Sequence, residues 1–196
     1  MVPALSHEEK TTLLQLARQS LESAVQGGSL PAPDPQRSSP RLRRPGASFV
    51  TLTRHGALRG CIGALQASQP LEEDVIDHAA AAGLEDFRFP PVQPNELADL
   101  RIEVSVLTDP QPLAYKSPDE LLRSLRPNTD GVILMSGLHR ATFLPQVWEK
   151  VPEAELFLDL LCEKAGLPQR AWRRGDLQVL TYQVESFDEG EAGGQA

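Results

Sequence analysis

Two strand-like segments separated by a two-residue turn impose a hairpin on this chain. Residues 48–53 (SFVTLT) and 57–65 (ALRGCIGAL) flank the turn pair His55-Gly56. Glycine takes the positive φ that a tight hairpin turn requires, so the two segments are expected to pair side by side. Residues 101–107 (RIEVSVL) alternate apolar and polar side chains, as a strand with one buried face does. A mainly antiparallel sheet is therefore predicted.

Helical patterns separate these strand segments. Ser6-His7-Glu8-Glu9 has the form of a capping box, and the apolar spacing that follows predicts a helix over residues 7–25. Further helices are predicted at residues 70–83, 118–125 and 157–165, and further strands at 131–135, 141–144 and 177–187. Hairpins interspersed with helices favour an α+β fold, in which helices flank a mainly antiparallel sheet.

The length of the chain suits one domain with its own core, or one domain with a small appended lobe. We expect a single domain over residues 5–187. Within it, residues 31–46 are rich in proline and arginine and are predicted to form an extended loop, which either binds an anion or is a solvated connector. Residues 188–196 (DEGEAGGQA) contain no core-forming side chain and are predicted to be a flexible tail.

Composition and charge weigh against several classes of protein. The formal net charge of -8 disfavours nucleic acid as a partner. No apolar run approaches the roughly 20 residues that span a bilayer, and the first 30 residues lack the pattern of an export signal, so a cytoplasmic location is expected. There is no CxxC or HExxH motif, and we expect neither a metal site nor a resident cofactor.

The segment 58–63 (LRGCIG) is the strongest candidate for a site. In a regular hairpin Cys61 would lie opposite Val50 and Arg59 opposite Leu52, with the guanidinium and the thiol on the same face. A nearby guanidinium favours the thiolate form of cysteine, whereas apolar burial favours the thiol. Gly60 and Gly63 flank the cysteine, and glycines within a strand are typical of a bulge or of the close approach of a ligand or another backbone. They therefore indicate either room for a substrate beside a reactive thiol or a helix packed closely on a buried, inert one.

Five segments, including the one around Cys61, match the pattern of a known family. These are EDFRFPP, IEVSVLTDPQPL, DGVILMSGLHRATFLPQVWEKVP, LCEKAGLPQRAW and, around Cys61, GASFVTLTRHGALRGCIGAL. Together they resemble the AMMECR family, whose bacterial members are called AmmeMemoRadiSam system protein A. The resemblance implies an α+β fold of the RAGNYA type with a smaller second lobe, and an enzymatic activity that is suspected but has no assigned reaction. It also implies, as partners, a Memo-type protein similar to extradiol dioxygenases and a radical SAM protein.

The resemblance carries over to particular residues of this chain. They are Arg59, Gly60, Cys61, Gly63, Arg88, Phe89, Glu103 and Asp130-Gly131. The chain departs from the family pattern in having Phe87 where many members have a proline before the arginine. It also lacks the histidine that some members carry shortly before the Asp-Gly pair, so a cysteine-histidine pair is not available there.

Three functions follow as hypotheses. In the first, Cys61 is the nucleophile or redox-responsive thiol of an enzyme, and Glu103 moves a proton or orients an arginine. Arg59, Arg88 and Asp130, together with Gly60 and Gly63, would then bind a small anionic molecule, nucleotide or peptide. In the second, the chain is a non-catalytic binding or adaptor protein that works with the Memo-type and radical SAM partners. The third, an RNA-associated module, rests on fold analogy alone.

Overall fold

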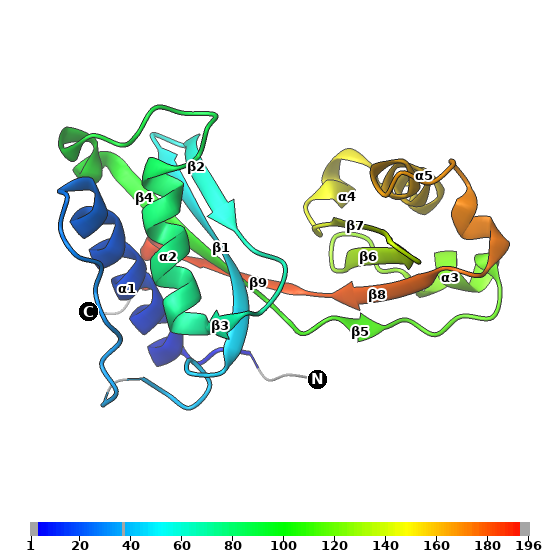
Figure 1. The fold of residues 1–196 in the computed structure, drawn as a ribbon, viewed down its shortest axis with the longest axis horizontal. Helices are drawn as coiled ribbons and strands as arrows, with labels where there is room; N and C mark the ends of the chain where they lie inside the picture. Colours follow the sequence, from blue (N-terminus) through cyan, green and yellow to red (C-terminus); the bar gives the residue numbers. More distant parts are fainter. Residues whose placement is uncertain (1–3, 37, 193–196) are drawn as a thin grey trace. The chain divides into compact units, whose positions relative to one another are not determined.

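Strand β1 (Pro45–Arg54) is an inner strand of the first of two sheets. The structure is a computed structural model that describes residues 4–36 and 38–192. β1 pairs antiparallel with β2, β3 and β4, and β9 lies beyond β4, which gives the order β2-β1-β4-β9 (Figure 1). Its neighbours are β2 (Ala57–Gly63), β3 (Gln69–Pro70), β4 (Leu100–Leu107) and β9 (Val184–Asp188).

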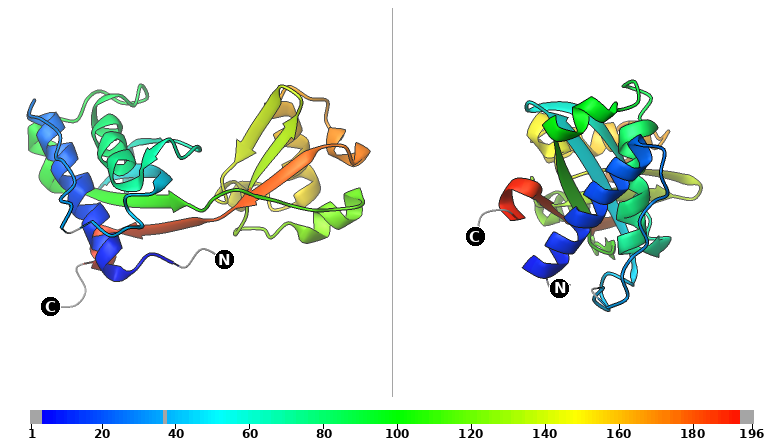
Figure 2. Two further views of the ribbon diagram at one scale, coloured as in Figure 1. Left: turned by 60° about the horizontal axis from the view of Figure 1, so that its bottom comes forward. Right: turned by 90° about the vertical axis from the view of Figure 1, so that its left-hand side faces the viewer.

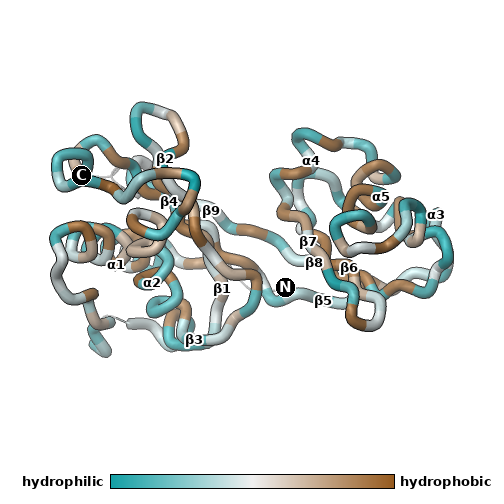
Figure 3. Tube along the Cα trace, turned by 45° about the horizontal axis from the view of Figure 1, so that its top comes forward, coloured by the Kyte–Doolittle hydropathy of each residue, from teal (hydrophilic) through white to brown (hydrophobic). Residues whose placement is uncertain are grey.

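Two helices, α1 (His7–Val25) and α2 (Leu71–Leu84), pack against each other and against this sheet. Figure 2 shows α1, in blue, lying over the first sheet. The predicted capping box is present, because Ser6 Oγ accepts the N–H of Glu9 while the Glu9 carboxylate accepts the N–H of Ser6. Along both helices the colour in Figure 3 alternates between hydrophobic and hydrophilic, as amphipathic helices require. Their apolar sides form one core with Val50, Leu52 and Ile102 of the sheet.

A second sheet, with the order β5-β8-β6-β7, has a core of its own. Its strands are β5 (Gln111–Pro112), β6 (Gly131–Ser136), β7 (His139–Phe143) and β8 (Gln178–Tyr182). The helices of this part are α3 (Pro118–Ser124), α4 (Val147–Lys150), α5 (Ala154–Lys164) and η2 (Ala171–Arg174), and η1 (Pro94–Asp99) precedes β4. Trp148 stacks on Phe157 at 3.7 Å between ring centroids, and Cys162 is fully buried near them, as its apolar helical surroundings predict.

The chain divides into two compact units, one for each sheet. The first runs to Leu107 and resumes at Glu185, and the second is Thr108–Val184. The predicted α+β class with antiparallel sheets flanked by helices is confirmed. No helix among the described residues is long and apolar enough to cross a membrane.

The predicted final strand over residues 177–187 is two strands. β8 belongs to the second sheet and β9 to the first, with Gln183 between them. The N–H of Gln183 donates to Thr108 Oγ1 at 2.9 Å, and the N–H of Thr108 donates to the Gln183 carbonyl at 2.9 Å. Thr108 and Gln183, both in the second unit, are therefore bonded to each other where β8 ends and β9 begins. The alternation of apolar and polar residues along 177–187 does not reveal this change of sheet.

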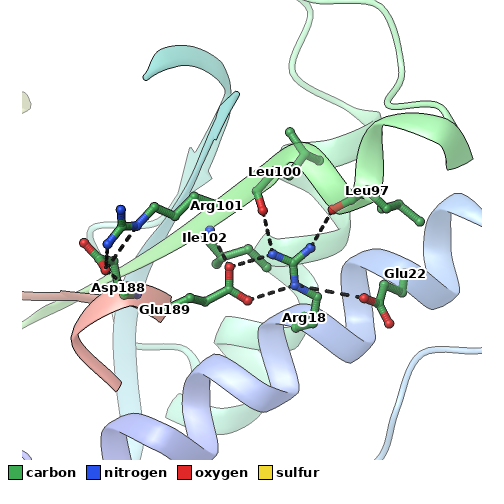
Figure 4. Close-up of polar contacts among 9 residues, drawn as sticks. Arg18, Glu22, Leu97, Leu100, Arg101, Ile102, Asp188 and Glu189 are labelled. Atoms are coloured by element: carbon green, nitrogen blue, oxygen red, sulfur yellow. Dashed lines mark hydrogen bonds and ion pairs between the residues drawn. The ribbon is translucent and has the colours of Figure 1, made fainter. Parts of the chain in front are cut away.

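The prediction of a flexible tail from residue 188 is wrong for its first residues. Asp188 ends β9, and a short helix α6 (Glu189–Ala192) follows. The carboxylate of Glu189 accepts hydrogen bonds from Arg18 Nε at 2.8 Å and from the N–H of Ile102 at 2.9 Å (Figure 4). Arg18 also donates to the carbonyls of Leu97 and Leu100. Residues 193–196 lie outside the described residues.

We expect Glu189→Ala to lower the free energy of unfolding by about 1–3 kcal/mol, because it leaves the Ile102 N–H without an acceptor and removes the carboxylate partner of Arg18. Denaturation in urea measures the change. Glu22→Ala is the matched control, since Glu22 is exposed and its carboxylate is 4.0 Å from Arg18; its effect should stay within about 0.5 kcal/mol. Equal effects of the two substitutions would contradict an anchoring role for Glu189.

Candidate functional site

Cys61 lies half-buried on β2, an edge strand of the first sheet. Its neighbour across β1 is Thr51, whose Oγ1 donates a hydrogen bond to the Cys61 Sγ at 3.3 Å. Thr51 pairs in turn with Glu103 on β4. Side chains alternate along each strand, so this row lies on the face opposite the core residues Val50 and Leu52. Thiol, hydroxyl and carboxylate groups therefore form one row across three strands, which we call the Cys61 row.

The predicted register of the hairpin is wrong by one residue. Thr53 pairs with Leu58 as expected, but Leu52 pairs with Gly60, which leaves Arg59 as the additional residue of a bulge. Cys61 is consequently opposite Thr51 and not opposite Val50. The thiol thus has a hydrogen-bond donor as its cross-strand neighbour where an apolar side chain was predicted.

The two glycines around Cys61 serve close packing. A Cβ atom on Gly60 would overlap the carbonyl oxygen of Ala82 in α2, and one on Gly63 would overlap the ring of Phe49. Space at both positions is already filled by the protein. Of the two alternatives, the structure favours the close approach of a neighbouring element over room for a ligand.

Arg59 is paired with a carboxylate of its own and does not lie free beside the thiol. Its Nε and Nη2 donate to the two carboxylate oxygens of Glu96, each at 2.9 Å, and its Nη1 donates to the Pro90 carbonyl at 3.0 Å. The hydrogen bond from Arg59, supported by the N–H of Gln93, lowers the pKa of Glu96 from 4.5 to about 2. The sequence-based pairing of Arg59 with Cys61 is therefore corrected.

Arg88 takes the place beside Cys61 that Arg59 was predicted to occupy. Its Nη2 donates to the Cys61 carbonyl at 3.2 Å. Hydrogen bonding to Asp86 raises the pKa of Arg88, and the Cys61 side chain adds to the effect through its charge and a hydrogen bond. The guanidinium is thus close enough to the thiol for an electrostatic interaction.

Asp86 is the residue of this site that the sequence reading did not assign. Its Oδ1 accepts Arg88 Nε at 2.8 Å, and its Oδ2 accepts Arg88 Nη2 at 2.6 Å and the N–H of Cys61 at 2.8 Å. These donors, Arg88 first, hold the pKa of Asp86 well below its usual range. A signal was present in the sequence, because Asp86 precedes Arg88 by two residues and lies three residues after the end of the predicted helix.

Glu103 was predicted to act as a base or to pair with Arg59 or Arg88. Both arginines bind other carboxylates, and the bond shown for Glu103 is a long one of 3.4 Å from Ser105 Oγ. Glu103 is half-buried. The predicted pairing of Glu103 with Arg59 or Arg88 is therefore not present.

Asp130 belongs to the second unit, and the structure gives it an internal role. Its carboxylate is 2% exposed and accepts Arg126 Nη2 at 2.6 Å and the backbone N–H of Arg126 at 2.9 Å. Its carbonyl accepts the indole N–H of Trp148 at 2.7 Å. These bonds stabilise the turn before β6 and leave the carboxylate without a surface for a ligand.

Ser48, Asp74 and His78 bring together the side-chain types of a hydrolase triad without its geometry. Ser48 Oγ donates directly to Asp74 Oδ2 at 2.6 Å, and this carboxylate oxygen of Asp74 lies 3.1 Å from His78 Nδ1. In a triad the imidazole lies between the serine and the carboxylate. Because Ser48 is also fully buried, this cluster joins α2 to β1 and is not a nucleophile site.

Two cavities of about 240 and 100 Å³ lie between α1 and the segment before β1, and both include Thr12 and Ser38. Cys61, Thr51 and Glu103 do not line either of these two cavities. Among residues 4–36 and 38–192, no three His, Cys, Asp or Glu side chains are grouped to hold a metal ion.

We expect Gly60→Ala to destabilise the first unit by about 1–3 kcal/mol, because the new methyl group would collide with the carbonyl of Ala82. The free energy of unfolding in urea measures this. Gly28→Ala is the control, since its nearest neighbour would be 3.4 Å away; it should leave stability unchanged or raise it by up to about 1 kcal/mol. A wild-type stability for Gly60→Ala would show that α2 can move away from β2.

The Arg59–Glu96 pair predicts a pH dependence. Because folding lowers the pKa of Glu96 to about 2, its contribution to stability is complete above about pH 4.5 and is lost as the pH falls through about 2. The difference in unfolding free energy between wild type and Glu96→Gln should therefore shrink between pH 5 and pH 2. A difference that stays constant over this range would contradict the pairing.

Comparison with known proteins places this arrangement in a family. The AMMECR1 family model matches residues 14–187. A protein of Methanothermobacter thermautotrophicus is 41% identical over 94% of this chain and 96% of its own length, and one of Thermofilum pendens is 40% identical over 94% and 92%. The crystal structure of the uncharacterized protein PH0010 from Pyrococcus horikoshii matches with a TM-score of 0.77 and 36% identity, covering 92% of this chain and 91% of that one. The resemblance seen in the sequence is confirmed, and the chain belongs to the AMMECR1 family.

Proposed function

We propose that this chain is an enzyme, or a component of one, whose reactive group is the Cys61 thiol and whose substrate is a small molecule with an anionic group. One observation carries the proposal: the half-buried Cys61 thiol receives a hydrogen bond from Thr51, while Asp86 accepts the N–H of Cys61 and Arg88 donates to its carbonyl. A cysteine with a merely structural role needs neither a donor to its sulfur nor a cation beside it. Cys162, which is fully buried among apolar side chains, is the internal comparison.

The residues of the row suit nucleophilic chemistry. In such a reaction the Cys61 sulfur forms a bond to an electrophilic carbon of the substrate, and the electron pair of the broken bond moves to the substrate oxygen or leaving group. The thiol proton passes to water, because Glu103 lies two strands away from Cys61, beyond the reach of a direct hydrogen bond. Thr51 Oγ1 donates a hydrogen bond to the Cys61 sulfur, and the Arg88 guanidinium binds the carbonyl of the same residue. Arg88 is also the cation available for a carboxylate or phosphate of the substrate.

A second candidate is a non-catalytic binding or adaptor protein that works with a Memo-type and a radical SAM protein. The observation in its favour is Phe87, which is 95% exposed between Asp86 and Arg88, with Leu58 of β2 also exposed. Exposed aromatic side chains next to an arginine are common anchors of protein interfaces. In this candidate Cys61 is part of the support for the loop that presents Phe87.

The rates at which the two cysteines are alkylated distinguish these candidates. In the folded protein Cys61 should react with iodoacetamide at least about tenfold faster than Cys162, because Cys162 is fully buried and its burial raises the pKa of the thiol. Mass spectrometry of peptides after timed labelling gives both rates, and Cys61→Ser confirms the assignment. If Cys61 reacts no faster than Cys162, the enzyme proposal fails and the adaptor is favoured.

A further inference from the structure

We infer that Asp86 is a positioning residue that aims Arg88 at the Cys61 thiol, and that this arrangement selects electrophiles with a negative charge. The inference rests on the proposed function and names both the substrate class and the residue that enforces it. Asp86 would not touch the substrate. It would act through Arg88 and through the backbone of Cys61.

The contacts of Asp86 leave it little freedom. Its side chain is 3% exposed, and its two oxygens accept the backbone N–H of Arg88 at 3.1 Å in addition to the guanidinium and the N–H of Cys61. A buried carboxylate is stable only when donors satisfy it, and here every donor comes from Arg88 or Cys61. Rotating the Asp86 side chain away would break bonds to both residues together.

These bonds also fix the guanidinium of Arg88. Nε and Nη2 both donate to Asp86, and two parallel bonds to a planar group define its plane. Nη2 donates as well to the carbonyl of Cys61, which ties the plane to the residue that carries the thiol. In the described part of the chain, Nη1 of Arg88 has no hydrogen-bond partner that the structure shows.

Exposure decides which charge of the pair a ligand meets. The Arg88 side chain is 45% exposed, whereas that of Asp86 is 3% exposed. Water and ligands therefore contact the cation, and the carboxylate lies behind it. The other arginine near the strand does not compete for this role, because Arg59 is 13% exposed and is bound to Glu96.

Two alkylating agents of nearly equal size test the inference. Iodoacetate carries a negative charge and iodoacetamide does not, and both are attacked by the same thiolate, which forms a C–S bond as iodide leaves. The ratio of their rates at Cys61 cancels the fraction of thiolate and the accessibility of the sulfur. Divided by the same ratio for free cysteine, it reports the local preference for an anion.

In the wild type this normalised ratio should be about three, and in Arg88→Gln it should be about one. Asp86→Asn should also lower it toward one, because the guanidinium loses its orientation. The direction is diagnostic. Removing a negative charge near the thiol would by itself attract anions and raise the ratio, so a rise, or no change, would overturn the positioning role. Asp77→Asn, an exposed aspartate on α2, is the matched control and should leave the ratio unchanged.

A second variant covers the case in which Asp86→Asn does not fold, which circular dichroism would reveal. Arg88→Lys keeps the charge but cannot make the two parallel bonds to Asp86. A ratio as low as that of Arg88→Gln would support orientation by Asp86, and a wild-type ratio would overturn it. If Cys61 reacts with neither reagent, the proposed function fails; if it reacts with both but shows no preference for iodoacetate, only this inference fails.

Discussion

The close approach of α2 to β2 is the constraint on which the Cys61 site depends. It is possible because Gly60 has no side chain, so the carbonyl of Ala82 lies where a Cβ would be. α2 ends two residues later, at Leu84, and Asp86 follows after Glu85, where its carboxylate reaches the N–H of Cys61. A larger residue at position 60 would move the end of the helix away from the strand. The carboxylate of Asp86 and the guanidinium of Arg88 would then no longer reach the backbone of Cys61.

Carboxylate partners decide the role of each arginine in this protein. Arg59 is held by Glu96 and Arg18 by Glu189, and each of these pairs joins segments that are distant in the sequence. Arg88 and Arg126 are both exposed arginines on buried carboxylates, but only Arg88 also binds the backbone of Cys61. An arginine in a sequence motif therefore does not by itself indicate an anion site. Its remaining exposure and the atoms that its partner leaves unbound are what matter.

The fold was more predictable than the site. Capping residues, turn glycines and alternating strands are local signals, and they placed α1, the β1–β2 hairpin and β4 close to their observed bounds. The register around Cys61 was predicted wrongly because Gly60 is consistent with a bulge but does not fix where the additional residue lies, which depends on how β2 packs. The bonds of Arg59 to Glu96 and of Arg88 to Cys61 involve segments whose proximity is set by the packing, whereas Asp86–Arg88 and Arg126–Asp130 are short-range pairs.

The sequence by itself determined the family, the antiparallel α+β class and the identity of the cysteine to study, because these follow from motifs and from periodicities within short segments. Only the tertiary structure decided that Thr51 is the neighbour of the thiol, that Arg88 replaces Arg59 beside it, and that Asp86 holds Arg88 in place. It also decided that the two glycines serve packing and that Asp130 belongs to another unit. The physical reason is that a single additional residue in a strand shifts its register, so each later residue pairs with a different neighbour. In addition, an arginine binds whichever carboxylate the packing of the chain brings within reach.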